Sequence, residues 1–399
     1  YEIRLSLVGS EMCIRDSIAD TYGPLVYHQL GETPRVYGLQ EAYTRFFADL
    51  DEGQQLIREY LDEGGDNNKF KEYDMLTNGK TLKEWLKFAN SLRLRLAMRI
   101  SNVDATLAKD QATKALNDNQ GVLEGARETI AVMGKNYINP LCAVAGWGEV
   151  YMNASMESII NGYEDPRGKK WYNTALLEGY QKQLLGIPIG LPMKDGDANI
   201  YSFCSSLNTS TIGEKTGAVL MSAAEVWLLR AEAALRGYTK ENPRTCYEYG
   251  VSTSFTQWDC AGASEYLESD KTPADYKDVV SGGKVGKDMK ALITISPKWE
   301  EDADIETKLE KIITQKWLAC WPESYEAWAE QRRTGYPKLF KVQNNTGKVI
   351  DTDIMIRRLP FSTDAATADP AQYATLTEKL GGADNGATRL WWDTGKNSF

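Results

Sequence analysis

The 399-residue sequence contains only one histidine, His28, and six cysteines that form no CxxC pair. One histidine excludes metal sites that need two, such as HExxH zinc proteases, and the lack of CxxC argues against a zinc ribbon or redox motif. Neither GxxxxGK[ST] nor GxGxxG occurs, so no phosphate-binding loop is indicated. Acidic residues outnumber basic ones, 56 to 46, and the net charge of −10 disfavours a protein that tracks nucleic-acid phosphates.

Long hydrophobic runs are also missing. The longest candidate, residues 218–235, is interrupted by Glu225, Arg230 and Glu232 and falls short of the about 18 apolar residues that span a bilayer. What is present is typical of a folded globular protein, with 42% hydrophobic and 26% charged residues. The length suits two or three domain-sized units or one large helical array. Aromatic residues are plentiful, with 11 Trp and 21 Tyr.

Residues 1–17 differ from the rest of the chain. They show no clear helix or strand period and resemble a translated sequencing-adapter read, so we set them aside as a non-native artefact; a genuine N-terminal strand is the alternative. We therefore expect residues 18–399 to form a single domain. The sequence does not begin with Met, and we expect its true start, including any signal peptide, to be lost.

The strongest periodic segments are helical. Residues 81–100 place apolar side chains on one stripe, with Thr81 and Glu84 spaced as a capping box. Further helices are predicted for residues 40–61, 104–118, 222–236, 306–320 and 323–334. Ser222 and Glu225 suggest a second capping box, and Gly335 a helix stop. These helices fall into blocks at about 40–118, 220–237 and 306–335.

Between the helical blocks lie stretches rich in Gly, Pro, Asn and aromatic residues. We expect residues 120–215, 238–300 and 336–399 to be irregular, with little β-structure beyond short runs such as residues 348–350. Repeated helix pairs with small residues at their contacts predict a mainly α fold, a TPR-like solenoid carrying long loop-rich insertions.

Five cysteines remain once residues 1–17 are set aside. Cys246 and Cys260 lie in one stretch that we expect to be a loop, and they could pair in an exported protein. Free or buried thiols are the simpler interpretation. No metal site and no cofactor are predicted; there is no EF-hand loop, although scattered Asp and Asn could hold an ion.

Six segments in order resemble the SusD/RagB family of nutrient-binding outer-membrane lipoproteins. They include YGPLVYHQLGETPRVYGLQEAYTRFF, LKEWLKFANSLRLRLAMRIS, NPLCAVAGW with NGYEDPR, LMSAAEVWLLRAEAALRG, IITQKWLACWPESYEAWAEQRRTGYPKL and IRRLPFS with TRLWWD. The resemblance extends from about residue 18 to the C terminus. It departs from the family pattern near the N terminus, where the lipidated cysteine is missing and the first helices are truncated. Cys13 lies in the adapter-like stretch without a lipobox.

The resemblance implies a non-catalytic protein that is lipid-anchored at the bacterial outer membrane. Such proteins capture glycans or other nutrients and deliver them to a SusC-type TonB-dependent transporter, the partner we expect here. Membrane contact would come only through an N-terminal lipid anchor that this sequence does not contain. The family's loop insertions build a ligand face, which here corresponds to about residues 120–215 and 238–300.

A glycan binder needs flat aromatic faces for sugar rings and planar polar groups for hydroxyls. Six aromatic residues in the insertions are our candidate ligand contacts: Trp147, Tyr151, Tyr201, Tyr247, Trp258 and Tyr266. Packing of the loops themselves is the competing role for each. Tryptophans on helix stripes are expected in the core: Trp85, Trp227, Trp317 and Trp328. Trp391 and Trp392 are expected to dock the C terminus.

We interpret three shorter features of the sequence as structural. Arg332 and Arg333 follow Glu326 and Glu330 on one predicted helix, where i,i+3 and related charge pairs are expected. The GYEDPR sequence is expected to form a turn held by Asp165. His28 is expected to be a surface or packing residue, since no nucleophile motif such as GxSxG accompanies it.

Two other functions stay open. A helical carbohydrate-active enzyme needs only two facing carboxylates, which an acidic chain can always supply. A protein-interaction solenoid would bind only the transporter and would lack a concave aromatic pocket.

Overall fold

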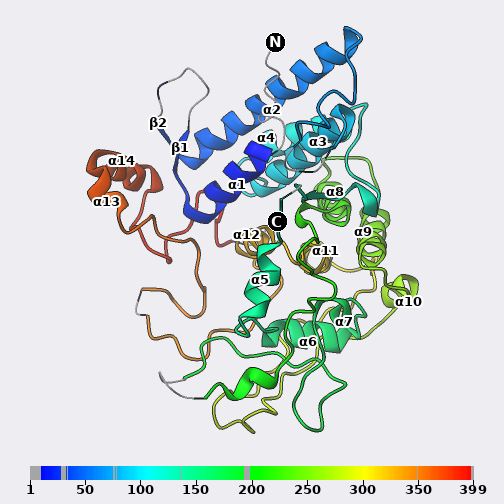
Figure 1. Ribbon diagram of the computed structural model, residues 1–399, viewed down its shortest axis with the longest axis vertical. Helices are drawn as coiled ribbons and strands as arrows, with labels where there is room; N and C mark the ends of the chain where they lie inside the picture. Colours follow the sequence, from blue (N-terminus) through cyan, green and yellow to red (C-terminus); the bar gives the residue numbers. More distant parts are fainter. Residues whose placement is uncertain are drawn as a thin grey trace.

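The structure is a computed structural model that describes residues 10–27, 33, 35–74, 77, 79–134, 136–192, 198–347 and 349–396. Within these ranges, side chains are described from Asp16 onward. Cys13 lies before that point and His28 lies in a gap between the ranges, so neither side chain is described. Within these ranges the fold is mainly α, as predicted. Figure 1 shows most helices in one half of the molecule and long irregular segments in the other.

The helices of the first third are α1 (Ser10–Tyr22), α2 (Leu39–Asp62), α3 (Leu82–Arg99) and α4 (Ala105–Leu116). Those of the middle are α5 (Pro140–Gly146), α6 (Ala154–Tyr163), α7 (Gly168–Trp171), α8 (Ala223–Leu235), α9 (Pro243–Gln257) and α10 (Ala263–Leu267). Those of the last third are α11 (Ile305–Ala319), α12 (Ser324–Thr334), α13 (Ala365–Ala368) and α14 (Pro370–Leu380). Two antiparallel pairs of short strands join β1 (Leu25–Tyr27) to β2 (Arg35–Tyr37) and β3 (Ile130–Val132) to β4 (Ala218–Met221).

All six helices predicted from periodicity are present, as α2, α3, α4, α8, α11 and α12. Local signals set their ends. Thr81 and Glu84 form the predicted capping box of α3, and Asp104 caps α4. Gly335 ends α12 in the left-handed conformation, at φ 79°, where a residue without Cβ avoids strain.

The capping box predicted for α8 is wrong. Ser222 does accept a hydrogen bond from the Glu225 backbone N–H. The Glu225 carboxylate, however, accepts two hydrogen bonds from Arg95 of α3. The buried Arg95 guanidinium therefore binds the Glu225 carboxylate, which the local sequence pattern had assigned to the N-terminal cap of α8.

Several helices lie where the sequence predicted irregular structure. Residues 238–300 begin with α9 and α10, so Cys246 and Tyr247 are on a helix. Gly250 of α9 lies so close to Leu228 of α8 that a Cβ would come within 2.6 Å of the leucine Cγ. Tertiary contact thus stabilises a segment whose Thr, Ser and Gly content disfavours a helix.

Two terminal regions also differ from the prediction. α14 forms within residues 336–399, with Asp369 as its cap and Pro370 at its first position. α1 begins at Ser10, although residues 1–17 showed no helix period. The predicted domain boundary at residue 17 therefore falls inside a helix, while the artefactual origin of residues 1–17 stays a prediction. Of the β run expected at 348–350, residue 348 is outside the described residues and the other two form no strand.

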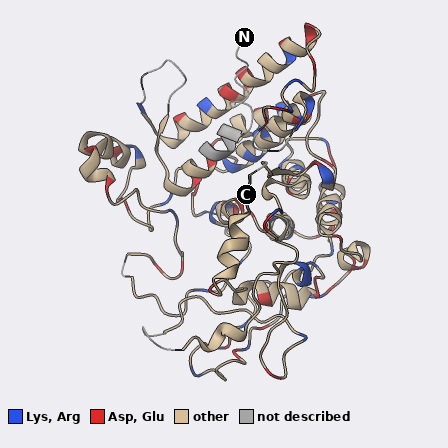
Figure 2. Cartoon of the chain, viewed as in Figure 1, with Lys and Arg blue, Asp and Glu red and all other residues tan. Residues whose placement is uncertain are grey.

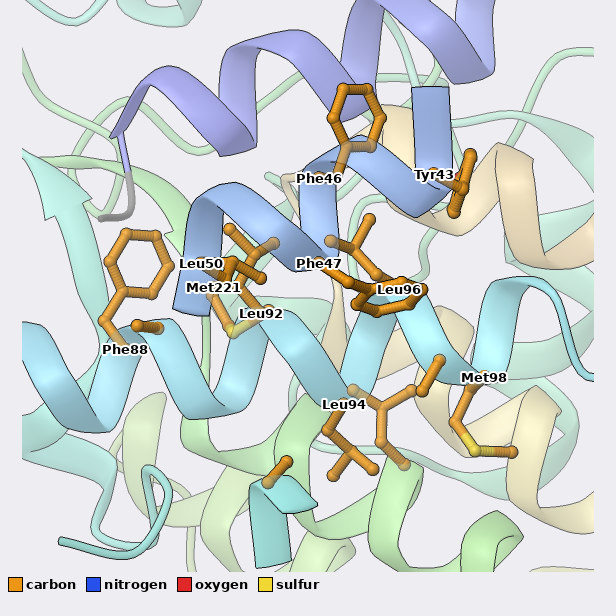
Figure 3. Close-up of a cluster of buried hydrophobic side chains, with 14 of the residues drawn as sticks. Tyr43, Phe46, Phe47, Leu50, Phe88, Leu92, Leu94, Leu96, Met98 and Met221 are labelled. Carbon is orange, nitrogen blue, oxygen red and sulfur yellow. The ribbon is translucent and has the colours of Figure 1, made fainter. Parts of the chain in front are cut away.

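A first hydrophobic core fills the space between α2, α3 and α4. Figure 3 shows Tyr43, Phe46, Phe47 and Leu50 of α2 above Leu92 and Leu96 of α3, with Met221 alongside. A second core joins α6, α8, α9 and α11. α8 contributes to both, because its small alanines allow helices to approach it from two sides. We call α2, α3, α4, α8, α11 and α12 the helical scaffold.

The tryptophans divide between core and partial burial. Trp85 and Trp392 are buried, as predicted. Trp227, Trp317, Trp328 and Trp391 are only half-buried. The Trp227 indole N–H donates to the Glu124 carbonyl, and its ring lies under the Arg230 guanidinium at 3.7 Å. These three helix tryptophans and Trp391 therefore sit at the edge of the core, and the indole N–H groups of Trp227 and Trp328 donate to backbone carbonyls there.

Cysteine and membrane expectations can be compared with the described residues. Cys142, Cys204, Cys246, Cys260 and Cys320 are free thiols. The alternative Cys246–Cys260 disulfide is not formed. Within the described ranges, none of the helices is long and hydrophobic enough to span a bilayer.

Candidate ligand-binding site

Trp147 is the most exposed of the six predicted ligand contacts. It caps the C-terminal end of α5, and 67% of its surface is accessible. Tyr151, four residues on, is half-buried and donates a hydrogen bond to the Gly148 carbonyl at 2.7 Å. Its backbone pairs with Ser206. The Tyr151 bond fixes the turn after α5 and leaves the indole of Trp147 open to a ligand.

Tyr201, Tyr247 and Tyr266 are buried, which corrects the expectation that they present rings to a ligand. The Tyr201 hydroxyl lies 3.1 Å from an Asp278 carboxylate oxygen, to which it donates. The Tyr247 hydroxyl donates to the Pro297 carbonyl. Tyr266 accepts from the Gln315 side-chain amide at 2.8 Å. Each of these hydroxyls therefore forms a hydrogen bond with another polar group inside the fold.

Trp258 belongs to an aromatic cluster that joins distant segments. Trp171 and Trp321 stack with ring centroids 5.0 Å apart, and Trp258 meets Trp321 edge-on at 5.2 Å. The Trp321 N–H donates to the Tyr172 hydroxyl at 3.1 Å. The half-buried Trp258 thereby packs the end of α9 against the turn between α11 and α12.

An apolar cleft of about 650 Å³ lies on the other side of this turn, a volume typical of small-molecule sites. Four segments distant in sequence form its walls: α1, the start of α5, the β3–β4 pair, and the α11–α12 turn with the start of α12. Its lining includes Ile18, Tyr22, Leu141, Val144, Val219 and Tyr325. Tyr325 is 56% exposed. Figure 2 shows that α5, which forms one wall of the cleft, carries no charged residue.

Two polar side chains in the cleft wall hold its backbone in place. Asn139 accepts a hydrogen bond from the Leu141 N–H and donates to the Thr216 carbonyl at 3.0 Å. Glu323 caps α12 by accepting from the Glu326 N–H at 3.1 Å. Burial, reinforced by nearby carboxylates, raises the pKa of Glu323 to about 8. This carboxyl is therefore easier to protonate than an ordinary glutamate.

The cleft combines exposed aromatic rings with polar groups, and Trp147, which is not itself part of the lining, follows the lining residue Val144 by three residues at the end of α5. Trp147 as a ligand contact stays a prediction, and the sequence did not predict Tyr22, Tyr325 or Glu323 of the cleft lining. Their signal was absent because residues near 20, 140 and 325 meet only through tertiary structure. No group of three or more His, Cys, Asp or Glu suited to a metal occurs among the described residues.

The predicted roles of Asp165 and Arg333 are confirmed, whereas Arg332 donates to backbone carbonyls and pairs with no carboxylate among the described residues, which corrects the expectation of an ion pair there. Asp165 and Arg167 form a fully buried ion pair, and Asp165 also accepts from the Arg167 backbone N–H, holding the turn. Arg333 pairs with Glu330 one turn earlier.

Comparison with known proteins identifies relatives. The family model described as SusD-like, SusD and RagB outer-membrane lipoproteins, matches residues 12–393. A SusD homologue from Bacteroides vulgatus is 55% identical, with a TM-score of 0.95, covering 99% of this chain and 80% of its own. A chitin-binding SusD homologue from Flavobacterium johnsoniae is 35% identical, with a TM-score of 0.92, covering 99% and 81%.

A third solved structure, a SusD-like protein from Bacteroides thetaiotaomicron, is 31% identical with a TM-score of 0.87 and covers 95% of this chain and 78% of its own. No curated protein sequence matches the chain. The TPR-like helical fold predicted from sequence is the fold of these structures. The chain therefore belongs to the SusD-like family of SusD and RagB outer-membrane lipoproteins.

Proposed function

We propose that this protein is a non-catalytic glycan-binding lipoprotein of the bacterial cell surface that delivers its ligand to a SusC-type TonB-dependent transporter. Family membership supports surface glycan binding. The observation that carries the proposal to this chain is the apolar cleft with Trp147 beside it. A relative that is 35% identical over nearly the whole chain is a chitin-binding protein.

The cleft matches the chemistry of a neutral sugar chain. Exposed Trp147 and Tyr325 offer faces for the C–H sides of sugar rings. Asn139 and Glu323 are polar side chains in a mainly apolar wall, where both already hold backbone groups. Tyr151 and Trp258 are proposed to support the site through their contacts within the protein. The buried Tyr201, Tyr247 and Tyr266 hold the insertions together.

The ligand assignment is tested by isothermal titration of the protein with chitin oligosaccharides and a panel of other neutral glycans. We expect saturable binding of at least one glycan and no release of shorter products on prolonged incubation. Product release would indicate the carbohydrate-active enzyme instead. Silence across the panel, combined with co-purification of a SusC-type transporter, would indicate the interaction solenoid.

The transporter role is tested in cells that depend on the bound glycan. Deleting the gene should abolish uptake of that glycan, and the protein should co-purify with a SusC-type transporter from solubilised outer membranes. Attachment to the membrane is proposed to occur through an N-terminal lipidated cysteine, which this sequence does not contain.

A further inference from the structure

A second pocket, of about 430 Å³, lies at the opposite end of α12 from the apolar cleft. The cleft is lined by the first residues of α12 and the second pocket by its last ones, which places them about 15 Å apart along the helix. We call the second pocket the basic pocket. Its other walls are residues 338–341, 353–357 and 389–396.

Cations dominate the lining of the basic pocket. Seven basic residues line it and one acidic residue does: Arg332, Arg333, Lys338, Lys341, Arg357, Arg389 and Lys396, with Asp353. Arg332 and Arg357 are buried and form the floor. Lys338, Lys341 and Lys396 are exposed at the rim, and Arg389 is half-buried. This concentration contrasts with the net charge of −10 of the whole chain.

The carboxylates that pair with these cations are too few to neutralise them. Arg333 belongs to the buried network of Glu232 and Glu330 and is left out of the count. The other six cations share three paired carboxylates among the described residues: Glu310, Asp353 and Asp393. Asp393 alone serves both Arg357 and Arg389. The pocket therefore keeps a local excess of positive charge.

Arg332 shows the deficit most clearly. Its guanidinium lies 3.6 Å from the ring centroid of Trp328 and 4.9 Å from that of Trp392. It donates to the Trp328 and Arg357 carbonyls, but its Nη2 has no hydrogen-bond partner among the described residues. Burial, together with the nearby Arg99 and Arg357, lowers the pKa of Arg332 to about 9, and Asp20 and Asp393 only partly offset the loss of water. A buried cation without a paired anion costs free energy that an anionic ligand nearby would recover.

The backbone around the pocket is also unusual. Met355, which lines it, adopts a left-handed conformation with φ 57°, a strained geometry for a residue with a side chain. Gly395 has φ 63°, and a Cβ there would lie 2.7 Å from the Arg389 guanidinium carbon. The chain therefore passes directly over Arg389, and both features shape the pocket wall.

We propose that the basic pocket binds an oxyanion, either the carboxylate of an acidic sugar or a sulfate group. The rim lysines supply mobile charge, and the guanidinium of Arg389 supplies the planar donors that suit carboxylate and sulfate oxygens. The pocket is a second binding site, separate from the cleft assigned to neutral glycans.

Isothermal titration of the whole chain with glucuronate, inorganic sulfate and glucose, at fixed ionic strength, tests this proposal. We expect saturable binding of glucuronate, sulfate or both, and none of glucose. Glucuronate alone would assign a carboxylate ligand and sulfate alone a sulfated one. The double variant Lys338→Gln/Lys341→Gln should weaken this binding by about tenfold. A loss of that size corresponds to about one charge-assisted hydrogen bond.

Lys114→Gln is the matched control, because Lys114 is an exposed lysine of α4 that pairs with Asp51, and neither residue lines the pocket. It should leave oxyanion binding unchanged. The absence of saturable oxyanion binding would overturn the proposal, as would equal weakening by the control. Trp147→Ala should affect only the neutral glycan and the lysine variant only the oxyanion, so failure of one site is distinguishable from failure of the other.

Discussion

Four buried cations of the helical scaffold meet buried carboxylates, whereas Glu157, in the loop-rich residues 120–215, is buried without a cationic partner among the described residues. These cations, from α3, α11 and α12, interlock with carboxylates of α8 and α12. Arg95 pairs with Glu225 at 2.6 Å, Lys316 with Glu326 at 2.7 Å, and Arg333 with both Glu232 and Glu330 at 2.6 Å. Arg99 pairs with Glu326 and Glu330. Burial alone would raise the pKa of Glu330, but Arg333 and Lys316 hold it well below its ordinary value.

Glu157 illustrates the other solution to burial. Its carboxyl accepts from the Gly186 N–H at 2.5 Å, near Tyr276 and Cys204, and burial raises its pKa to about 8. In the scaffold, charge is kept and compensated. At Glu157 the charge is instead removed by protonation, although Asp165 and Arg167 in the same loop-rich residues keep a buried ion pair. The two regions should therefore respond differently to mutation and to pH.

The largest effect is expected from breaking the scaffold network. Arg333→Ala leaves Glu232 and Glu330 buried without their main partner, and should lower the free energy of unfolding by roughly 3–5 kcal/mol in chemical denaturation. The control Arg244→Ala removes an exposed pair with Glu248 and should cause no measurable change. Equal losses in the two variants would contradict the compensated-network account.

A smaller, pH-dependent effect is expected in the loop-rich part. The folded pKa of Glu157 lies above its unfolded value near 4.5, so the wild type loses stability as pH rises toward and through about 8. Glu157→Gln stays neutral and can still accept from Gly186. Its free energy of unfolding relative to wild type should rise by roughly 2–4 kcal/mol between pH 5 and pH 9. A difference that does not vary with pH would show that Glu157 is charged in the fold.

A modest effect is expected from the buried tyrosine that the sequence assigned to the ligand. Tyr247→Phe removes the hydrogen bond to the Pro297 carbonyl and should cost about 1 kcal/mol in thermal or chemical denaturation, with glycan affinity unchanged. Tyr151→Phe, whose hydroxyl bond is more exposed, should cost less. Weaker glycan binding by Tyr247→Phe would restore the original sequence interpretation.

Local signals explain what the sequence could predict. The stripe of α3 and its capping box involve residues within one or two turns, so periodicity and spacing sufficed. Glu225 had the same local pattern, but Arg95, 130 residues away, takes its carboxylate. α9 escaped prediction because its stability depends on Gly250 lying against α8. Contacts between residues so distant in sequence leave no signal in a short stretch of the chain.

The candidate site follows the same rule. An exposed tryptophan after a glycine-rich turn could be predicted, and Trp147 is such a residue. Tyr247 and Tyr266 looked equivalent in sequence but are buried by α9, α10 and their neighbours. The cleft itself brings together α1, α5 and α12, so only the fold could reveal it.

The most direct test of the central claim is titration of the best-bound glycan into Trp147→Ala. We predict at least about tenfold weaker binding with stability within about 0.5 kcal/mol of wild type, since the indole is exposed. Tyr249→Ala, another exposed aromatic truncation but on α9 away from the cleft, should bind like wild type. Undiminished binding by Trp147→Ala, or an equal loss in Tyr249→Ala, would contradict the placement of the glycan site beside α5.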